Sequence, residues 1–289
     1  MKVKKAVIPA AGFGTRMLPI SKAVPKEMFP IVDKPSIAYI VEEALASGIT
    51  DILIIISRGK EAIENYFDKS FELEYYLEKS QKQEILNSVK NINIGANIYF
   101  IHQQEMKGLG HAISCAESFV GNEPFAVLSG DDVIMGERPV CQQLVDAFEE
   151  YGLSVVGAQE MPKEEIGKYG SLKVRNIKDN IFMCTDMVEK PTPDKVLSLY
   201  SILGRYILTP EIFKILKNTL PGVGGEIQLT DAMKVLARSE GIIMVDFFGK
   251  RYDMGSKLGA MMANVEAALK HPEISKKFRD YIKKIANSI

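Results

Sequence analysis

The chain has 289 residues, of which 46% are hydrophobic and 25% charged, so it has enough apolar side chain for a sizeable core and is not disordered. Its 36 basic and 37 acidic residues give a net charge of -1, which excludes a global field that would attract nucleic acid or an anionic membrane. Its three cysteines fit neither a metal knuckle nor a disulfide framework, and its N-terminal apolar run of about five residues is too short for a signal peptide, so we expect a cytoplasmic protein without a membrane segment.

In the first half of the chain, short segments rich in valine and isoleucine alternate with helical patterns. The alternation predicts an α/β fold, with a mostly parallel central sheet, helices on both faces and ligands at the carboxyl ends of the strands. Strands are expected at 6–9, 52–56, 98–101 and 125–128, and helices at 37–46, 61–67, 73–89 and 111–119.

The second half is more mixed. No repeat or flexible linker interrupts the sequence, so we expect one domain over 1–289, with halves at about 1–150 and 151–260 and C-terminal helices at about 257–289. The last, amphipathic helix is expected to pack on its own domain, with a dimer contact as the alternative. Strands are predicted at 154–158, 181–188, 205–208 and 242–248, and helices at 210–216, 228–240, 257–270 and 274–286.

A glycine-rich segment, Ala10-Ala-Gly-Phe-Gly-Thr-Arg16, follows the first predicted strand directly. Its small residues let backbone N–H groups approach phosphate oxygens, and Arg16 offers a planar fork for bidentate contact with a phosphate. Glycine is absent where a dinucleotide-binding fingerprint needs its third glycine, and the spacing of a P-loop is also absent. Such a turn alone can be merely structural. The lysines and prolines of the next segment, 22–30, form a rigid basic excursion that favours phosphate binding.

The segment Ala6-Val-Ile-Pro-Ala-Ala-Gly-Phe-Gly-Thr-Arg-Met-Leu-Pro19, with Pro25-Lys-Glu-Met28 and Val32-Asp-Lys-Pro35, resembles bacterial UTP–glucose-1-phosphate uridylyltransferases. The resemblance extends over residues 3–270, because further motifs follow in the family's order. They are Lys107-Gly-Leu-Gly-His-Ala112, Gly130-Asp-Asp132, Tyr169-Gly170, Val188-Glu-Lys-Pro191, Leu203-Gly-Arg-Tyr206, Gly225-Glu-Ile-Gln-Leu-Thr-Asp231 and Lys250-Arg-Tyr-Asp-Met-Gly255.

The resemblance implies a Rossmann-like nucleotidyltransferase fold, with a nucleotide-binding first half and a sugar-binding second half. It also implies catalytic roles for Arg16, Lys26 and Lys190 at the reacting phosphates, and Mg²⁺ binding by Asp131 and Asp253. The remaining implied contacts are Ala10, Ala11, Gly12, Gly14, Thr15, Glu27, Gln103 and Gly108 with the nucleotide, and Asp132, Gly170, Glu189 and Glu226 with the sugar.

Without the resemblance, several of these residues could have an ordinary structural role. Asp131 follows a predicted strand, where a carboxylate suits a hard cation, although a solvated turn is the alternative. Asp253 also reads as a turn residue, Glu226 as an acidic first-turn residue of a helix, and Glu189 as part of a solvated strand edge. His111 has no carboxylate or cysteine at a fixed spacing, so we do not expect it to be catalytic.

The expected reaction is the transfer of a uridylyl group from UTP to α-D-glucose 1-phosphate by a homo-oligomeric enzyme. Two alternatives are a thymidylyltransferase acting on a sugar 1-phosphate and a catalytically silent sugar-nucleotide sensor. The sequence departs from the family near the expected sugar subsite, at Ser171-Leu172 and at Ser198-Leu-Tyr-Ser201. These departures leave galactose or N-acetylated sugars open as substrates.

Overall fold

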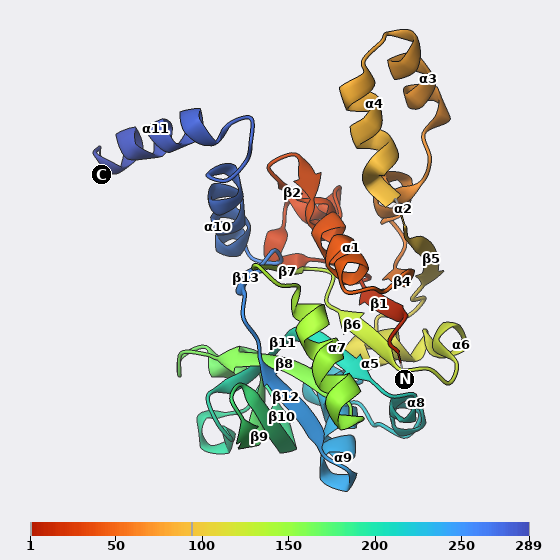
Figure 1. Cartoon of the computed structure of the whole chain (residues 1–289). Coiled ribbons are helices and arrows are strands. Elements are labelled where there is room, and N and C mark those ends of the chain that lie inside the picture. Colours follow the sequence, from red (N-terminus) through yellow and green to blue (C-terminus); the bar gives the residue numbers. More distant parts are fainter. Residues whose placement is uncertain (1, 94, 289) are drawn as a thin grey trace.

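The computed structural model describes residues 2–93 and 95–288, and its centre is a nine-stranded sheet (Figure 1). The strand order is β5-β4-β1-β6-β11-β8-β12-β10-β9, so strands from both halves of the chain share one sheet. The strands are β1 Lys5–Pro9, β4 Asp51–Ile56, β5 Asn97–His102, β6 Phe125–Leu128, β8 Val155–Glu160, β9 Gly170–Lys178, β10 Ile181–Glu189, β11 Tyr200–Leu208 and β12 Ile242–Asp246.

The sheet is mixed rather than mostly parallel. The first-half strands β5, β4, β1 and β6 are parallel, as expected, and β8 pairs parallel with β12. However, β11 runs antiparallel to β6 and β8, and β10 runs antiparallel to β12 and β9. Strand β9 was not predicted, because its residues beyond Leu172 are largely exposed at the end of the sheet. Only a short turn separates β9 from β10, and such a connection requires antiparallel pairing.

Helices cover both faces of the sheet, as predicted (Figure 1). Successive side chains of a strand point to opposite faces, so Ala6 and Ile8 of β1 belong to one hydrophobic cluster and Val7 to the other. The first cluster includes α1 (Ser36–Ala46) and α7 (Val140–Tyr151), and the second includes α5 (Leu109–Ser114), α8 (Glu211–Leu216) and α9 (Leu229–Ser239). A separate short helix, α6 (Glu117–Val120), continues the predicted helix 111–119.

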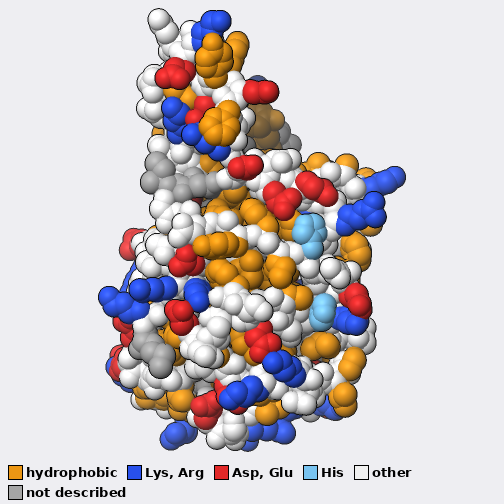
Figure 2. Space-filling model, turned by 90° about the vertical axis from the view of Figure 1, so that its right-hand side faces the viewer, with side chains coloured by type: hydrophobic (Ala, Val, Ile, Leu, Met, Phe, Trp, Pro, Cys, Tyr) orange, Lys and Arg blue, Asp and Glu red, His pale blue; other side chains and the backbone are white. Residues whose placement is uncertain are grey.

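A helical hairpin projects from the body beyond α2 (Glu61–Phe67), and Figure 2 shows it rising above the rest of the molecule. The single helix predicted at 73–89 is two helices, α3 (Phe71–Lys79) and α4 (Gln83–Lys90). Gln81 between them has a φ of 57°, which a right-handed helix does not accommodate, so the chain reverses there.

The C-terminal helices are α10 (Lys257–Ala268) and α11 (Ser275–Ala286). The expectation that the last helix packs on its own domain is wrong: α11 has no buried residue and extends away from the body (Figure 1). Pro272, just before α11, cannot continue a helix, and the chain turns there.

Short elements complete the frame around the cleft described below. Strands β7 (Asp132–Met135) and β13 (Lys250–Asp253) pair antiparallel, with Asp253 opposite Asp132. The basic excursion consists of short 3-10 turns rather than a helix, as its prolines predict. No described helix is both long and apolar enough to span a bilayer. The remaining elements are η1 Thr15–Met17, η2 Ile20–Lys22, η3 Lys26–Met28, β2 Pro30–Ile31, β3 Lys34–Pro35, η4 Asn91–Asn93, η5 Ile166–Lys168, η6 Pro193–Lys195 and η7 Val223–Gly225.

Candidate active site

A cleft of about 530 Å³ opens beside the segment that follows β1. Such a position, at the carboxyl ends of parallel strands, is where α/β folds bind ligands. Nine of the residues predicted from the sequence line this one cleft, so the structure brings the glycine-rich segment next to an acid, a lysine and the predicted base-binding residues. They are Ala11, Gly12, Gly14, Thr15, Lys26, Gln103, Gly108, Asp131 and Glu226.

Three side chains donate hydrogen bonds to backbone carbonyls of the glycine-rich segment. Ser57 Oγ donates to the carbonyl of Ala11 at 2.7 Å, Ser21 Oγ donates to that of Gly14 at 2.8 Å, and Lys60 Nζ donates to that of Ala10. Gly14 has a φ of 66°, a left-handed conformation that glycine adopts without strain. The loop is therefore fixed in shape before any phosphate binds.

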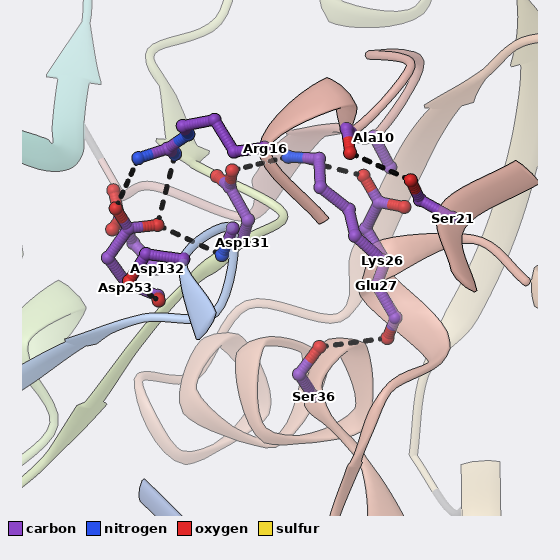
Figure 3. Close-up of polar contacts among 12 residues, drawn as sticks. Ala10, Arg16, Ser21, Lys26, Glu27, Ser36, Asp131, Asp132 and Asp253 are labelled. Carbon is purple, nitrogen blue, oxygen red and sulfur yellow. Dashed lines mark hydrogen bonds and ion pairs between the residues drawn. The ribbon is translucent and has the colours of Figure 1, made fainter. Parts of the chain in front are cut away.

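Lys26 lies at the centre of a buried chain of charges (Figure 3). Its Nζ donates to Asp131 Oδ2 and is 3.6 Å from Glu27 Oε1, while Lys60 Nζ is 2.7 Å from Glu27 Oε2. Burial works against the charge of Lys26, but Asp131 and Glu27 outweigh it and raise the pKa of the ammonium. Burial lowers the pKa of Lys60. Glu27 is completely buried, so here its carboxylate holds the two lysines and does not line the cleft expected to take the nucleotide.

Arg16 forms the second cation–carboxylate pair, with Asp253 (Figure 3). Its Nη1 donates to Asp253 Oδ2 at 2.7 Å and its Nη2 to Asp253 Oδ1 at 3.2 Å. The arginine side chain is 62% exposed, so this pair contributes little to stability and can exchange partners. The structure thus pairs each predicted phosphate-binding cation of the first half with a predicted metal-binding carboxylate.

Gly255 marks the point where the two carboxylates converge. A Cβ at this position would lie 2.8 Å from Asp131 Oδ2, 3.0 Å from Asp253 Oδ1 and 2.7 Å from Arg16 Nη2. The glycine leaves open a space between two carboxylate oxygens. This arrangement fits Mg²⁺, which binds through one or two carboxylates together with substrate phosphates. The described residues contain no cluster of three or more His, Cys, Asp or Glu side chains suited to a metal, so water molecules and phosphate oxygens would complete the coordination.

Asp132, expected to contact the sugar, is only 7% exposed. Its Oδ1 lies 2.5 Å from Arg251 Nη2, and burial raises the pKa of its carboxyl group. Its backbone carbonyl accepts a 2.7 Å bond from Arg205, which is itself buried and held bidentately by Glu43 at 3.0 and 2.7 Å. In this structure the Asp132 carboxylate faces an arginine rather than the cleft.

The other sugar-side residues lie along β9, β10 and α9. Thr230 Oγ1 donates to Glu189 Oε2 at 2.7 Å, and a Cβ on Gly170 would lie 3.3 Å from the same oxygen. Lys190 is 46% exposed, and its Nζ is 3.7 Å from Glu189 Oε1. These three predicted residues, Gly170, Glu189 and Lys190, are therefore grouped together, although they do not line the 530 Å³ cleft.

Glu226 differs from them because it lies on the nucleotide side. Gly108 has a φ of 98°, and a Cβ there would lie 2.6 Å from the Cβ of Glu226. Gln103 Nε2 donates to the Gly108 carbonyl at 3.3 Å and lies 2.9 Å from His111 Nδ1. His111 thus orients the side-chain amide of Gln103.

The two departures from the family pattern lie against each other. Ser171 Oγ donates to the Ser198 carbonyl at 2.9 Å and accepts from the amides of Leu197 and Ser198 at 3.1 and 3.2 Å. Ser198 Oγ in turn donates to the Leu172 carbonyl at 2.6 Å. No local pattern indicates that these changes are coupled, because their contact depends on the pairing of β11 with β9.

Several charged residues near the site were not predicted as site residues. Lys60 and Arg58 follow β4 and, together with Lys22, line an adjoining cavity of about 270 Å³ that shares Gly12 and Lys26 with the cleft. Arg251 lies within a recognised motif, but its partner is 119 positions earlier in the chain, at Asp132. The one signal in the sequence for Arg58 and Lys60 is their position after the carboxyl end of β4.

Comparison with known proteins identifies the family of the chain. A family model described as nucleotidyl transferase matches residues 5–268. The UTP–glucose-1-phosphate uridylyltransferase YngB of Bacillus subtilis (strain 168) is 49% identical over 284 residues, covering 98% of this chain and 96% of that protein.

Two solved structures show the same fold. A UDP-glucose pyrophosphorylase complexed with UDP-glucose aligns with a TM-score of 0.86 at 42% identity, over 93% of this chain and 100% of that one. A UTP-bound enzyme from Acinetobacter baumannii aligns with a TM-score of 0.90 at 35% identity, over 97% and 98%. The expected nucleotidyltransferase fold is confirmed, apart from the mostly parallel sheet, and the chain belongs to the nucleotidyl transferase family, among the bacterial UTP–glucose-1-phosphate uridylyltransferases.

Proposed function

We propose that this enzyme transfers a uridylyl group from UTP to α-D-glucose 1-phosphate, giving UDP-glucose and diphosphate. The observation that carries the proposal is the kinship with enzymes of that name along 98% of the chain. The geometry is consistent with it, since a preformed phosphate loop presents Arg16 and Lys26 opposite Asp131 and Asp253.

In the proposed reaction, an oxygen of the sugar phosphate attacks the α-phosphorus of UTP in line. The bond from the α-phosphorus to the oxygen that bridges it to the β-phosphorus breaks, and diphosphate leaves with that electron pair. The second pKa of a phosphate monoester is about 6, so the nucleophile is already ionised at neutral pH. No general base is required, and catalysis consists of positioning two anions and stabilising their charge.

Exchange of charge partners is the proposed task of Arg16 and Lys26. Before substrate binds, the two cations are neutralised by Asp253 and Asp131. Phosphates of UTP then take over the cations, which frees both carboxylates. Asp131 and Asp253 would hold Mg²⁺, which, when bound, neutralises phosphate charge. Lys190, on the sugar side, is exposed enough to reach the phosphate of the incoming sugar.

In this proposal, the first half of the domain binds UTP and the second half binds the sugar. Ala10, Ala11, Gly12, Gln103 and Gly108 receive the uracil and ribose, and Gly14 and Thr15 the triphosphate. The adjoining cavity adds Lys22 and Arg58, whose charges suit the β- and γ-phosphates. The sugar is received by the second-half residues Gly170 and Glu189, and by Glu226, which contacts it from the nucleotide cleft.

Release of diphosphate tests the function. We expect release only when UTP, glucose 1-phosphate and Mg²⁺ are all present, and omission of any one should abolish it. Faster turnover of dTTP than of UTP would favour the thymidylyltransferase alternative. Binding of UTP without any release would favour the silent sensor. A panel of glucose, galactose and N-acetylated sugar 1-phosphates in the same assay identifies the sugar.

We also propose that the enzyme is a cytoplasmic homo-oligomer. Helix α10 exposes Leu258 and Met261 at 71% and 61%, and α11 carries Phe278 and Tyr281 on a helix without buried residues. A twelve-residue helix is marginal in water unless its apolar side is covered. Light scattering of the intact chain and of a Phe278→Glu/Tyr281→Glu variant tests this, because loss of the apolar side should yield a monomer.

A further inference from the structure

We propose that Arg251 and Tyr169 are positioning residues, which tie the strand segment carrying Gly170, Glu189 and Lys190 to the acidic wall at Asp132. The inference deepens the proposed function and rests on it. The described contacts that carry it form one continuous chain, from a buried carboxylate on β7, through an arginine on β13, to the residue that begins the sugar side.

The first link is the pair between Asp132 and Arg251. Both side chains are largely buried, at 10% and 13% exposure, and their closest nitrogen and oxygen are 2.5 Å apart. Separating a buried ion pair leaves an uncompensated charge, which makes the pair hard to break. Asp132 is also anchored from the other side, since its carbonyl accepts from Arg205 at 2.7 Å. Arg251 is therefore held firmly on the acidic wall.

The second link runs from Arg251 to Tyr169. Arg251 Nη1 donates to Tyr169 Oη at 3.2 Å, and the guanidinium carbon lies 5.1 Å from the centre of the tyrosine ring. One arginine thus contacts both the hydroxyl and the face of the ring, a combination that fixes the ring's position and tilt.

The third link runs through the backbone of Tyr169. Its carbonyl accepts the N–H of Lys190 at 3.0 Å, and Lys190 has a φ of 43°. A left-handed conformation at a residue other than glycine persists only where the surroundings impose it. The bond to Tyr169 is one such restraint, so a displaced Tyr169 would release the backbone of Lys190.

Every member of the chain lies beside a predicted site residue. Asp132 follows Asp131, Arg251 lies two positions before Asp253 on β13, and Tyr169 precedes Gly170. A displacement of any of these three residues therefore changes the separation between the metal-side carboxylates and the sugar-side residues. A purely structural ion pair would stabilise the fold without this consequence.

The test uses Tyr169→Phe, which removes the hydroxyl but keeps the ring and the backbone carbonyl. Its matched control is Tyr252→Phe, on the same strand as Arg251, where the lost hydroxyl donates to Glu266 at 2.7 Å outside the proposed chain. For Tyr169→Phe we expect kcat/KM for glucose 1-phosphate to fall about 10-fold, while the Kd of UTP measured by calorimetry stays within about twofold. The control should leave both unchanged.

A double variant separates positioning from stability. Arg251→Gln alone leaves Asp132 unpaired and is expected to lower the melting temperature, whereas Asp132→Asn/Arg251→Gln restores neutrality and recovers much of it. The double variant should still show the reduced kcat/KM for glucose 1-phosphate. Recovery of kcat/KM together with the melting temperature, or an unchanged kcat/KM in Tyr169→Phe, would overturn the inference. Absence of turnover in the unaltered enzyme would instead refute the proposed function.

Discussion

Replacing Lys26 with methionine removes the one cation among the described residues that both contacts Asp131 and lines the cleft. Methionine keeps most of the apolar stem, so the change is chiefly one of charge. The loss of one preorganised group that stabilises developing charge costs about 2.7–4 kcal/mol of transition-state stabilisation, so kcat/KM should fall about 10²- to 10³-fold. The same substitution leaves the mostly buried Asp131 without its cation, and removal of a buried partner destabilises by about 3–5 kcal/mol.

The variant should at the same time bind divalent cations better in the absence of UTP. Lys26 competes with a metal ion for Asp131, and methionine does not. Titration with Mn²⁺, followed by paramagnetic relaxation of water, measures this affinity without turnover. Lys217→Met is the control, because Lys217 pairs with Glu117 on the surface, where ion pairs contribute about 0–1 kcal/mol. Near-wild-type kcat/KM, or Mn²⁺ binding no tighter than in the parent, would refute the proposed charge exchange.

Three further predictions concern the glycine between the carboxylates, the dependence on pH and the cysteines. Gly255→Ala places a Cβ 2.8 Å from Asp131 Oδ2, so it should weaken Mn²⁺ binding in calorimetry and lower kcat at least about 10-fold, with little change in melting temperature. Burial opposes the charge of Asp131, but the attraction of Lys26 outweighs burial and lowers the pKa of the carboxyl group. The contribution of this carboxylate to stability is therefore present above its ordinary pKa of about 3.9 and is lost as the pH falls through the lower pKa of the folded state. The acid limb of kcat/KM near pH 6 should therefore follow the sugar phosphate, and move to lower pH with a fluorinated, more acidic analogue. Burial raises the pKa of Cys141 and Cys184 to about 12, so a thiol reagent at pH 8 should label at most Cys115 in native protein and all three cysteines after unfolding.

Local sequence was a good guide to the buried strands and to the phosphate loop. β6 lies where the apolar run 125–128 placed it, because an uninterrupted run of this kind is stable only with both faces covered. The segment after β1 forms short 3-10 turns and no α-helix, as its glycines and prolines predict. Both features are set by residues close together in the sequence.

Features that depend on distant partners were not predictable in this way. The burial of Glu27 between Lys26 and Lys60, and that of Asp132 against Arg251, follow from the packing of β4 and β13. No spacing within a motif encodes such contacts. The helix predicted at 73–89 was divided by Gln81, whose left-handed conformation is unusual for that residue type and has no local signature.

The most direct test of the proposed chemistry is to follow the α-phosphate of UTP. Enzyme is supplied with glucose 1-phosphate, Mg²⁺ and UTP radiolabelled in the α-phosphate, and in a parallel reaction with UTP labelled in the γ-phosphate. In-line attack on the α-phosphorus predicts that the first label appears in UDP-glucose and the second in diphosphate. An α-label found in free UMP or UDP, or a γ-label found in the sugar product, would contradict uridylyl transfer by this site.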